Sequence, residues 1–201
     1  MSKETIRGKI KNVYLAYAAG GIDADGSISI CRVNLKHSDY VSPRFVLEVT
    51  YTNTYEKIVE WYQKTFGGSW KNYRIRNDRK NHIAVMRDGR IVKAKRITCE
   101  WKITSTKALN FLKFIEPYLI GKKRQARLGI EFQKNMLNRK TISVKAGTGL
   151  SHRLAPEEIE KRNWYHTTVM KLNKHTLSPA EIKRVDALWK RRSDNPTSMV
   201  T

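Results

Sequence analysis

Residues 18–26 read Ala-Ala-Gly-Gly-Ile-Asp-Ala-Asp-Gly, a run of small residues that leads into two acids. An apolar segment precedes this run, and we predict a helix from about Asn12 to Gly21 that is buried on nearly every side. Each glycine near its end weakens an isolated helix by about 0.5–1 kcal/mol relative to alanine. A second element must therefore pack closely against these small residues to offset that cost.

Four segments beyond this helix show the pattern of half-buried strands. Their residues alternate between apolar and polar, a period of two that leaves one face of a sheet dry. The predicted strands are Ser27–His37, Arg44–Asn53, Trp70–Arg76 and Ile97–Thr104. A turn at residues 38–43 joins the first two strands, and Asp88-Gly89 indicates a hairpin tip between the last two.

Helical spacing predicts three more helices in the same part of the chain. One starts after a cap at Thr54 and ends at Gly67-Gly68, one stops before Pro117, and one carries an apolar stripe that includes Phe132. The order is then α-β-β-α-β-β-α-α, which predicts an α+β fold. We expect a four-stranded antiparallel sheet with helices on one face and with cations and amides on the other.

Three regions are expected along the chain. Residues 1–137 form the main domain, residues 138–153 look like a linker because glycines alternate with basic and small residues, and residues 154–201 form a C-terminal helical extension. Within the extension, Pro156 opens a helix to about Leu172. The run Ser178-Pro179-Ala180-Glu181 is a capping box that starts a last helix.

The charge of the chain predicts a polyanionic partner. There are 40 Lys and Arg residues against 18 Asp and Glu residues, for a formal net charge of +22. The cations are spread along the chain among Trp, Tyr and Asn, which favours nucleic acid over acidic proteins or an anionic membrane. No apolar stretch approaches the roughly 20 residues that span a bilayer, and the first residues lack a signal-peptide core. We expect no membrane partner and an intracellular location, in the cytoplasm or an organelle matrix.

Residues 18–26 resemble the motif of the LAGLIDADG homing endonucleases, with seven of nine letters matching. The departures are Ala18 and Gly21, at positions where the family usually has larger apolar residues. The resemblance covers roughly residues 10–137. It implies the family's αββαββα fold, in which the four-stranded sheet is a saddle for double-stranded DNA. One motif per chain implies the single-motif, homodimeric type.

The resemblance also implies a chemistry. Two copies of the helix would cross at a two-fold axis through Ala18, Ala19, Gly20 and Gly21. Mg²⁺ would be held at Asp25 and Ala24, one site near each scissile phosphate. Cuts would lie across the minor groove and leave short 3′ overhangs. From the residues alone, an acid at a helix end among positive charges is suited to binding a divalent cation through its oxygens. The alternative is that Asp23 and Asp25 do no more than terminate the helix.

Other catalytic positions follow from the same resemblance. Residues 117–126 are similar to the segment in which single-motif members keep a basic residue near the attacking water, and Lys122 is the matching residue. Alternatively, Lys122 has no catalytic role and is only a solvated cation at the start of a helix. The family often places a water-orienting glutamine at the end of the second strand, where this chain has Tyr51 with Asn53 nearby. The alternation puts Tyr51 on the dry face.

The size of the sheet predicts the length of the target. A ten-residue strand is roughly 33 Å long, so two subunits end to end reach about 65 Å, or near 20 base pairs. Two-fold symmetry predicts a pseudo-palindrome. The residues expected to contact DNA from the polar face are Arg32, Asn34, Lys36, Arg44, Glu48, Asn72, Arg74, Arg76, Glu100 and Lys102.

Two alternatives remain open at this point. Glu100-Trp101-Lys102 fits the acid-x-Lys core of PD-(D/E)xK nucleases, with Asp88 as the upstream acid. The resemblance itself also allows an intron-encoded maturase that binds RNA, or a DNA-binding regulator that does not cut. Asp25 favours the nuclease, because a pure binder does not need a carboxylate beside phosphate. The expected function is therefore a site-specific, Mg²⁺-dependent homing endonuclease.

Overall fold

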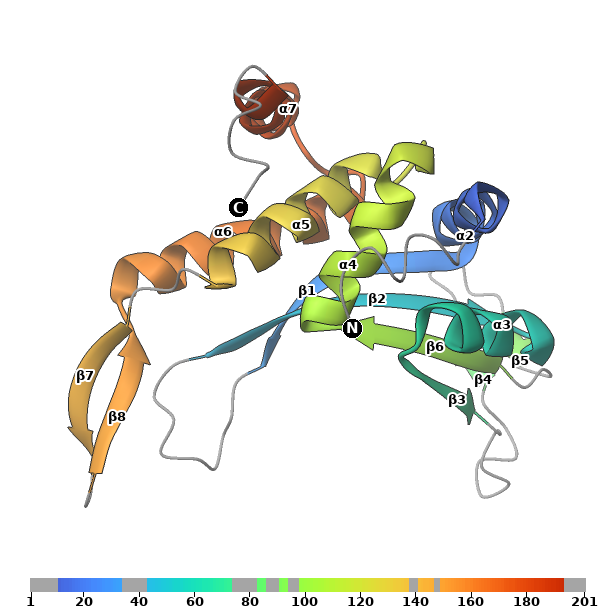
Figure 1. Cartoon of the computed structure of the whole chain (residues 1–201), viewed down its shortest axis with the longest axis horizontal. Helices are drawn as coiled ribbons and strands as arrows, with labels where there is room; N and C mark the ends of the chain where they lie inside the picture. Colours follow the sequence, from blue (N-terminus) through green and yellow to red (C-terminus); the bar gives the residue numbers. More distant parts are fainter. Residues whose placement is uncertain are drawn as a thin grey trace.

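The computed structural model describes residues 11–33, 43–73, 83–85, 91–93, 98–137, 141–146 and 149–193 (Figure 1). The chain has the predicted α+β architecture, and the described helices and strands up to Leu137 follow the expected order, with two additional short strands between the third and fourth predicted ones. The helices are α2 (Asn12–Asp25), α3 (Glu56–Phe66), α4 (Ser105–Ile115), α5 (Lys123–Leu137), α6 (Pro156–Asn173) and α7 (Pro179–Ser193), with a short 3-10 turn η1 (Glu116–Tyr118) after α4. The strands are β1 (Gly26–Val33), β2 (Arg44–Asn53), β3 (Ser69–Tyr73), β4 (Ile83–Val85), β5 (Ile91–Lys93), β6 (Thr98–Thr104), β7 (Thr141–Ala146) and β8 (Gly149–Leu154).

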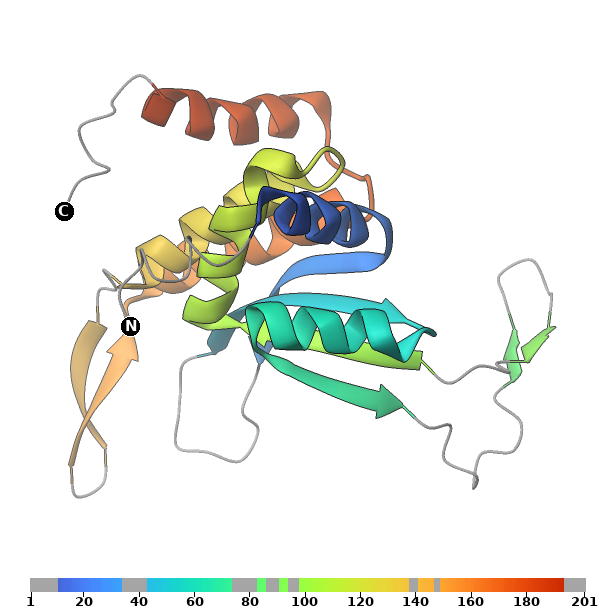
Figure 2. The same cartoon turned by 45° about the vertical axis from the view of Figure 1, so that its right-hand side comes forward.

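The main sheet has four antiparallel strands in the order β1-β2-β6-β3. Helices α2, α3 and α4 lie over one face of this sheet and leave its other face open (Figure 2). The alternation predicted in the second strand is confirmed, because Phe45, Leu47, Val49 and Tyr51 are all buried toward the helices. The sequence thus predicted both the sheet and the face on which the core lies.

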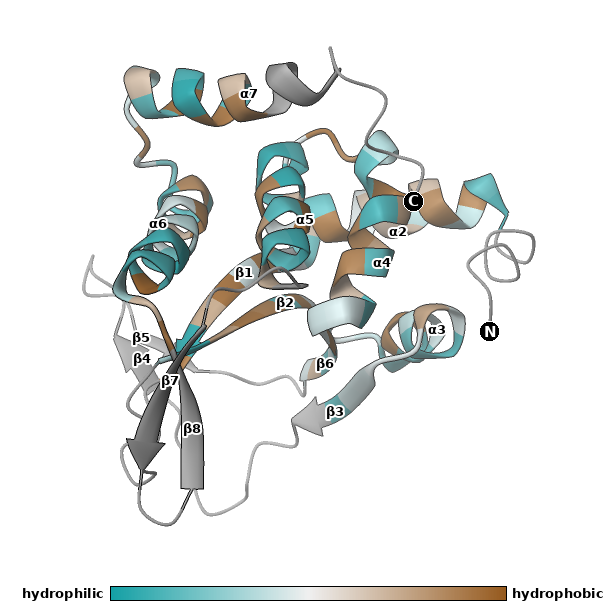
Figure 3. Cartoon of the chain, turned by 60° about the vertical axis from the view of Figure 1, so that its left-hand side comes forward, coloured by the Kyte–Doolittle hydropathy of each residue, from teal (hydrophilic) through white to brown (hydrophobic). Residues whose placement is uncertain are grey.

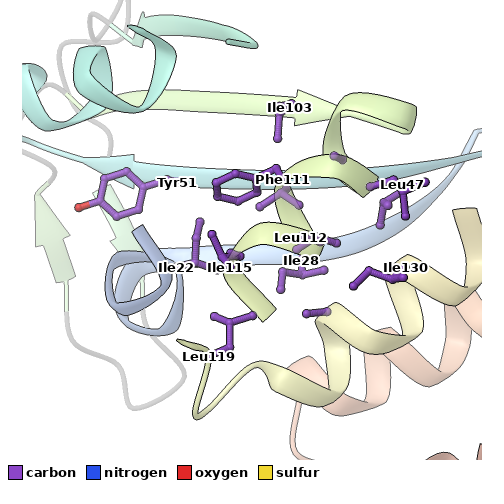
Figure 4. Close-up of a cluster of buried hydrophobic side chains, with 14 of the residues drawn as sticks. Ile22, Ile28, Leu47, Tyr51, Ile103, Phe111, Leu112, Ile115, Leu119 and Ile130 are labelled. Carbon is purple, nitrogen blue, oxygen red and sulfur yellow. The ribbon is translucent and has the colours of Figure 1, made fainter. Parts of the chain in front are cut away.

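One continuous core lies between the sheet and its helices. Figure 4 shows Ile22, Ile115 and Leu119 gathered between α2, the end of α4 and the sheet. Trp101 of β6 is fully buried, and its indole Nε1–H donates to the carbonyl of Gly67, 2.7 Å away. Gly67 and Gly68 both have positive φ angles, which explains why glycines end α3. Strands β1 and β2 are coloured mostly hydrophobic in Figure 3.

Helix α2 is longer and less enclosed than predicted. It continues through both acids to Asp25, so the expected end at Gly21 is wrong. Leu15, Ala18, Ala19 and Ile22 are buried. The prediction that the helix is buried on nearly every side is also wrong, because Val13 is 64% exposed and Tyr17 is 54% exposed in the single chain.

The segment predicted as a linker contains a hairpin instead. Strands β7 and β8 pair antiparallel from Thr141↔Leu154 to Ala146↔Gly149. A second small hairpin pairs β4 with β5, from Ile83↔Lys93 to Val85↔Ile91. The expected tip Asp88-Gly89 falls between these two strands and lies outside the described residues.

Helix α6 covers the edge of the main sheet. Strand β1 is an edge strand, and such strands present unpaired backbone groups. His166 Nδ1 lies 2.5 Å from the carbonyl oxygen of Ile30, and Asn173 Nδ2 donates to that of Ile28 at 2.9 Å. Val169 of α6 belongs to the same core as the sheet. Part of the C-terminal extension is therefore built into the main domain.

Helix α7 begins with the predicted capping box. The backbone N–H of Ser178 donates to Glu181 Oε2 at 2.9 Å, and the N–H of Glu181 donates to Ser178 Oγ at 3.3 Å. Arg124 of α5 makes two hydrogen bonds to the Asp186 carboxylate, at 2.9 and 3.0 Å. Among the described helices, none is both long and apolar enough to cross a membrane.

Candidate active site and nucleic-acid interface

The candidate site lies at the C-terminal end of α2. Asp25 is the last residue of the helix, strand β1 starts at Gly26, and both Ala24 and Asp25 are exposed. The backbone N–H of Gly26 donates to the carbonyl of Ile22 and closes the helix. The carbonyls that follow Ile22 have no partner within the helix, so oxygen acceptors lie beside the Asp25 carboxylate.

Asp23 has a structural role that the sequence did not specify. Its carboxylate accepts the backbone N–H of Ile120 on Oδ2 at 2.7 Å and that of Lys122 on Oδ1 at 2.8 Å. Asp23 therefore joins the end of α2 to the segment that follows η1, nearly 100 positions away in the chain. The two acids of the motif have different environments, since Asp23 is held by its own chain whereas Asp25 is exposed.

Lys122 lies against the same helix end. Its Nζ donates to the carbonyl of Ile22 at 2.8 Å and to that of Asp23 at 2.7 Å. Desolvation by burial lowers the pKa of Lys122 from its usual value, while the negative charges of Asp23 and Asp25 raise it. The structure thus fixes the Lys122 ammonium on carbonyls of the helix end that carries Asp25.

Tyr51 and Asn53 lie together at the end of β2. Asn53 Nδ2 donates to the Tyr51 hydroxyl at 3.0 Å, while Asn53 Oδ1 accepts the N–H of Tyr55 at 2.8 Å. Tyr51 is only 4% exposed and stacks on Tyr62, with ring centroids 4.6 Å apart. Desolvation raises the pKa of Tyr51, and so does the charge of Asp25, whereas the Asn53 bond lowers it. The phenol therefore stays neutral and can offer a fixed hydroxyl near the helix end.

The small residues of α2 contact the protein's own core, which corrects the predicted dimer interface. Ala18 and Ala19 have no exposed surface. The Tyr62 hydroxyl donates to the carbonyl of Ala18 at 2.8 Å, and a Cβ at position 21 would lie only 2.3 Å from that hydroxyl oxygen. Gly21 is therefore needed for Tyr62. Only Gly20 of the four predicted interface residues has open space beside it, with nothing within 4 Å of a Cβ built there.

A different stripe of α2 is available to a partner. It consists of exposed residues three or four positions apart, which share one side of a helix. These residues are Val13, Ala16, Tyr17, Gly20 and Ala24. Beside them, an open hollow is lined by Tyr14 and Tyr17 of α2 and by Trp61 of α3. The helical spacing of Val13, Tyr17 and Gly20 could have predicted this stripe from the sequence. The run of small residues instead predicted an interface on the side of α2 that contacts the core.

The strand register decides which predicted DNA contacts lie on the open face. Arg44, Glu48, Glu100 and Lys102 have the parity opposite to the buried residues of β2 and β6, as predicted. Arg32 pairs with Phe45, so it has the parity of the dry face, and its predicted position is wrong.

The parity of the third predicted strand is also reversed. Asn72 pairs with the buried Cys99, whereas Lys71 pairs with Glu100 on the open face. The prediction for Asn72 is therefore wrong, and the sequence analysis missed Lys71. Asn34, Lys36, Arg74 and Arg76 lie outside the described residues.

The centre of the open face carries an ionic group. Lys102 Nζ lies 3.1 Å from Glu48 Oε1 and 3.9 Å from Glu100 Oε1. This pairing gives Glu100 and Lys102 a role on the sheet surface that does not depend on the acid-x-Lys alternative, whose upstream acid Asp88 lies outside the described residues. Within the described part of the chain, no group of three or more His, Cys, Asp or Glu residues could hold a metal ion.

Comparison with known proteins bears on this site. Residues 8–108 match the family model of the PI-PfuI endonuclease subdomain, which spans half of the chain and includes the motif. The chain belongs to the LAGLIDADG homing endonucleases. By sequence, it matches none of the curated proteins.

Solved structures show that this homing endonuclease has the fold of its family. The homing endonuclease I-CvuI, in complex with its target in the presence of Ca, is 21% identical with a TM-score of 0.56, over 80% of this chain and 82% of that one. The archaeal intron-encoded I-Vdi141I, complexed with DNA, is 16% identical with a TM-score of 0.55, over 88% and 98%. A point mutant of I-SmaMI is 14% identical with a TM-score of 0.52, over 79% of this chain but 43% of that one.

Proposed function

We propose that this homing endonuclease cleaves both strands of DNA at a specific site, as a homodimer that uses Mg²⁺. The observation that carries the proposal is the exposed Asp25 carboxylate at the end of α2, beside Lys122 and next to the first strand of an open sheet. This arrangement supports a reaction on a phosphate that lies over the helix end.

The oxygen donors at the helix end fit a hard divalent cation. Asp25 supplies a carboxylate, and Ala24 belongs to the last turn, whose carbonyls lack helical partners. These are the residues that would hold Mg²⁺. Bound there, the ion would activate water and stabilise the charge of the displacement at phosphorus.

The protein's own groups would prepare this site. Lys122 keeps a cationic group at the helix end, where it attracts phosphate, and Asp23 fixes the backbone that carries Lys122. The Tyr51 hydroxyl, held by Asn53, offers a fixed polar group near the helix end, since Tyr51 pairs with Gly26. Such preorganised groups need little rearrangement when the substrate arrives.

A homodimer would complete the enzyme. The exposed stripe of α2 through Val13, Tyr17 and Gly20 offers apolar surface and a close approach for a second copy. The chain aligns with 98% of I-Vdi141I but with only 43% of the I-SmaMI mutant, as expected if it supplies one repeat of a two-repeat enzyme. Two copies would place two Asp25 residues near a common axis and would favour a pseudo-palindromic target.

The open sheet face and the net charge of +22 support DNA as substrate. Two such faces end to end would cover about 20 base pairs. We expect staggered cuts with short 3′ overhangs, as the family resemblance implies. A DNA substrate would be met inside the cell, and we expect the protein in the cytoplasm or an organelle matrix.

Cleavage of a randomised duplex library tests the proposal. With Mg²⁺, the protein should cut a small set of sequences of about 20 base pairs, and log Kobs for binding should fall with log salt by about 0.9 per neutralised phosphate. EDTA should abolish cutting. Asp25→Asn should abolish cutting but keep binding. RNA-dependent stimulation of intron splicing without DNA cuts would support the maturase alternative and contradict the proposal.

A further inference from the structure

The centre of the open sheet face is nearly neutral, although the chain as a whole is strongly basic. The residues with open-face parity in the described strands include three cations, Arg44, Lys71 and Lys102, and two acids, Glu48 and Glu100. Lys102 lies between the two carboxylates, at 3.1 Å from Glu48 and 3.9 Å from Glu100. This surface is therefore poorly suited to binding the phosphate backbone.

A contribution to the stability of the fold does not explain why Glu48 and Glu100 lie on this face. The side chains of Glu48 and Lys102 are 19% and 36% exposed, and ion pairs that water can reach contribute little to stability. On a DNA-binding surface, a carboxylate repels phosphate, and base edges that carry no donor cannot bind it. Such a group disfavours incorrect sequences and is favourable only where the DNA presents an amino group.

The Glu48–Lys102 pair fits a C·G base pair best, because lysine is a typical partner of guanine O6 and N7 and a carboxylate is a typical partner of cytosine N4. In the major groove, cytosine presents its N4 amino donor next to the O6 and N7 acceptors of its guanine partner. Glu48 offers an acceptor next to the donor of Lys102, on the neighbouring strands β2 and β6. The two sets of groups are complementary in order and in charge.

Short side chains surround the pair. By register, Glu48 lies opposite Ser29 and Thr104, and Lys102 lies opposite Thr50 and Ser69. Residues directly opposite each other share a face of the sheet, so the charged side chains are bordered by hydroxyl residues. Neighbours of this size leave room for base edges to approach the two charged groups.

We infer that Glu48 and Lys102 together recognise a C·G pair in each half-site of the target, with Glu48 on cytosine N4 and Lys102 on guanine. Glu100 holds the Lys102 ammonium from the other side. The inference rests on the proposed function, because it requires DNA on the open face.

Binding selection tests this inference. The full-length chain carrying Asp25→Asn, to prevent cleavage, is used to select duplexes from the randomised library, and the enriched sequences are compared with those of variants at the pair. The unaltered pair should prefer C·G at one position of each half-site by about 5- to 150-fold over other base pairs, the range given by one good bidentate contact. Glu48→Gln should lower that preference severalfold at this position only.

A charge exchange gives the sharpest outcome. In the double variant Glu48→Lys/Lys102→Glu, donor and acceptor change places, so the preferred pair should reverse to G·C at the same position. Arg44→Ala is the matched control, because it removes a cation from the same strand and should weaken all sequences alike. If the double variant does not fold, Glu48→Gln alone decides the matter.

The outcomes separate this inference from the proposed function. Specific binding with no C·G preference, or with a preference that Glu48→Gln leaves unchanged, would overturn the role of the pair and leave the endonuclease intact. A chain that binds no duplex would overturn the proposed function itself.

Discussion

The two sides of helix α2 contact different surroundings, although both come from the same short stretch of sequence. The inner side contacts the chain itself through Ala18, Gly21 and Asp23, which meet Tyr62 and the segment after η1. The outer side, with Gly20 and Asp25, is exposed in the single chain. The helix therefore uses its small residues and its first acid to build the subunit, and its outer side is left for a partner and a substrate.

This comparison shows that two similar residues one or two positions apart can have unrelated roles. Gly20 and Gly21 are adjacent, and only Gly21 has a neighbour that would meet a Cβ. Asp23 and Asp25 are both acids of the motif, and only Asp23 accepts backbone hydrogen bonds from the segment that carries Lys122. Substitutions at these two pairs test whether the inner and outer sides are as independent as their contacts suggest.

The largest effect is expected at Gly21. Gly21→Ala would place a methyl group 2.3 Å from the Tyr62 hydroxyl oxygen, so the ring must move and its bond to Ala18 must weaken. Overpacking together with the lost hydrogen bond should lower the free energy of unfolding by about 2–3 kcal/mol. Urea denaturation followed by tryptophan fluorescence measures this change.

Tyr62→Phe provides the control for Gly21→Ala. Without the hydroxyl, the atoms nearest to the new methyl group are ring carbons of Tyr51 and of residue 62, each at 3.4 Å. The cost of Gly21→Ala should then fall by about 1 kcal/mol or more in the Tyr62→Phe background. An equal cost in both backgrounds would show that the close approach of this hydroxyl is not the reason for the glycine.

A smaller effect on stability is expected at Asp23. An amide has one acceptor oxygen where the carboxylate has two, so Asp23→Asn gives up one of the two backbone bonds and the charge that strengthens the other. The free energy of unfolding should fall by about 1–2 kcal/mol, at the low end for charged hydrogen bonds because the site is partly exposed. Asp25→Asn is the matched comparison and should change it by less than about 0.5 kcal/mol. Equal losses in both variants would contradict the division between the two acids.

Sequence periodicity predicted the central strand of the sheet correctly and failed at the edges. In β2, every second residue from Phe45 to Tyr51 is buried, because a helix layer covers the whole strand. In the short edge strand β3, the register reverses the predicted faces, because Trp70 and Asn72 pair with the buried Trp101 and Cys99. In β1, Arg32 shares the parity of the buried Ile28 and Ile30, so it lies on the dry face and not on the polar face as predicted.

Long-range contacts could not be predicted from any local pattern in the sequence. The motif itself predicted an exposed acid close to the end of the helix, because nine consecutive residues carry that information, although the helix continues to Asp25 and does not end at Gly21. The bonds of Asp23 to Ile120 and Lys122 depend on two segments that only the folded chain brings together. The hairpin of β7 and β8 was missed for a different reason, since a segment whose glycines include Gly149 of β8 was interpreted as a linker.

The smallest effect on the single chain is expected at Gly20, where it should also have the opposite sign. A methyl group there meets nothing within 4 Å, so Gly20→Ala should stabilise the chain by about 0.5–1 kcal/mol, the usual gain in helix propensity. If a second α2 approaches closely at this position, the same methyl group should weaken dimerisation, by about tenfold for roughly 1.4 kcal/mol of steric cost. Sedimentation equilibrium measures the dimer constant, and denaturation at low protein concentration, where the chain is monomeric, measures the stability. A more stable chain with an unchanged dimer constant would mean that the two helices do not meet at Gly20, and the dimer axis would then have to lie nearer the aromatic hollow formed by Tyr14, Tyr17 and Trp61.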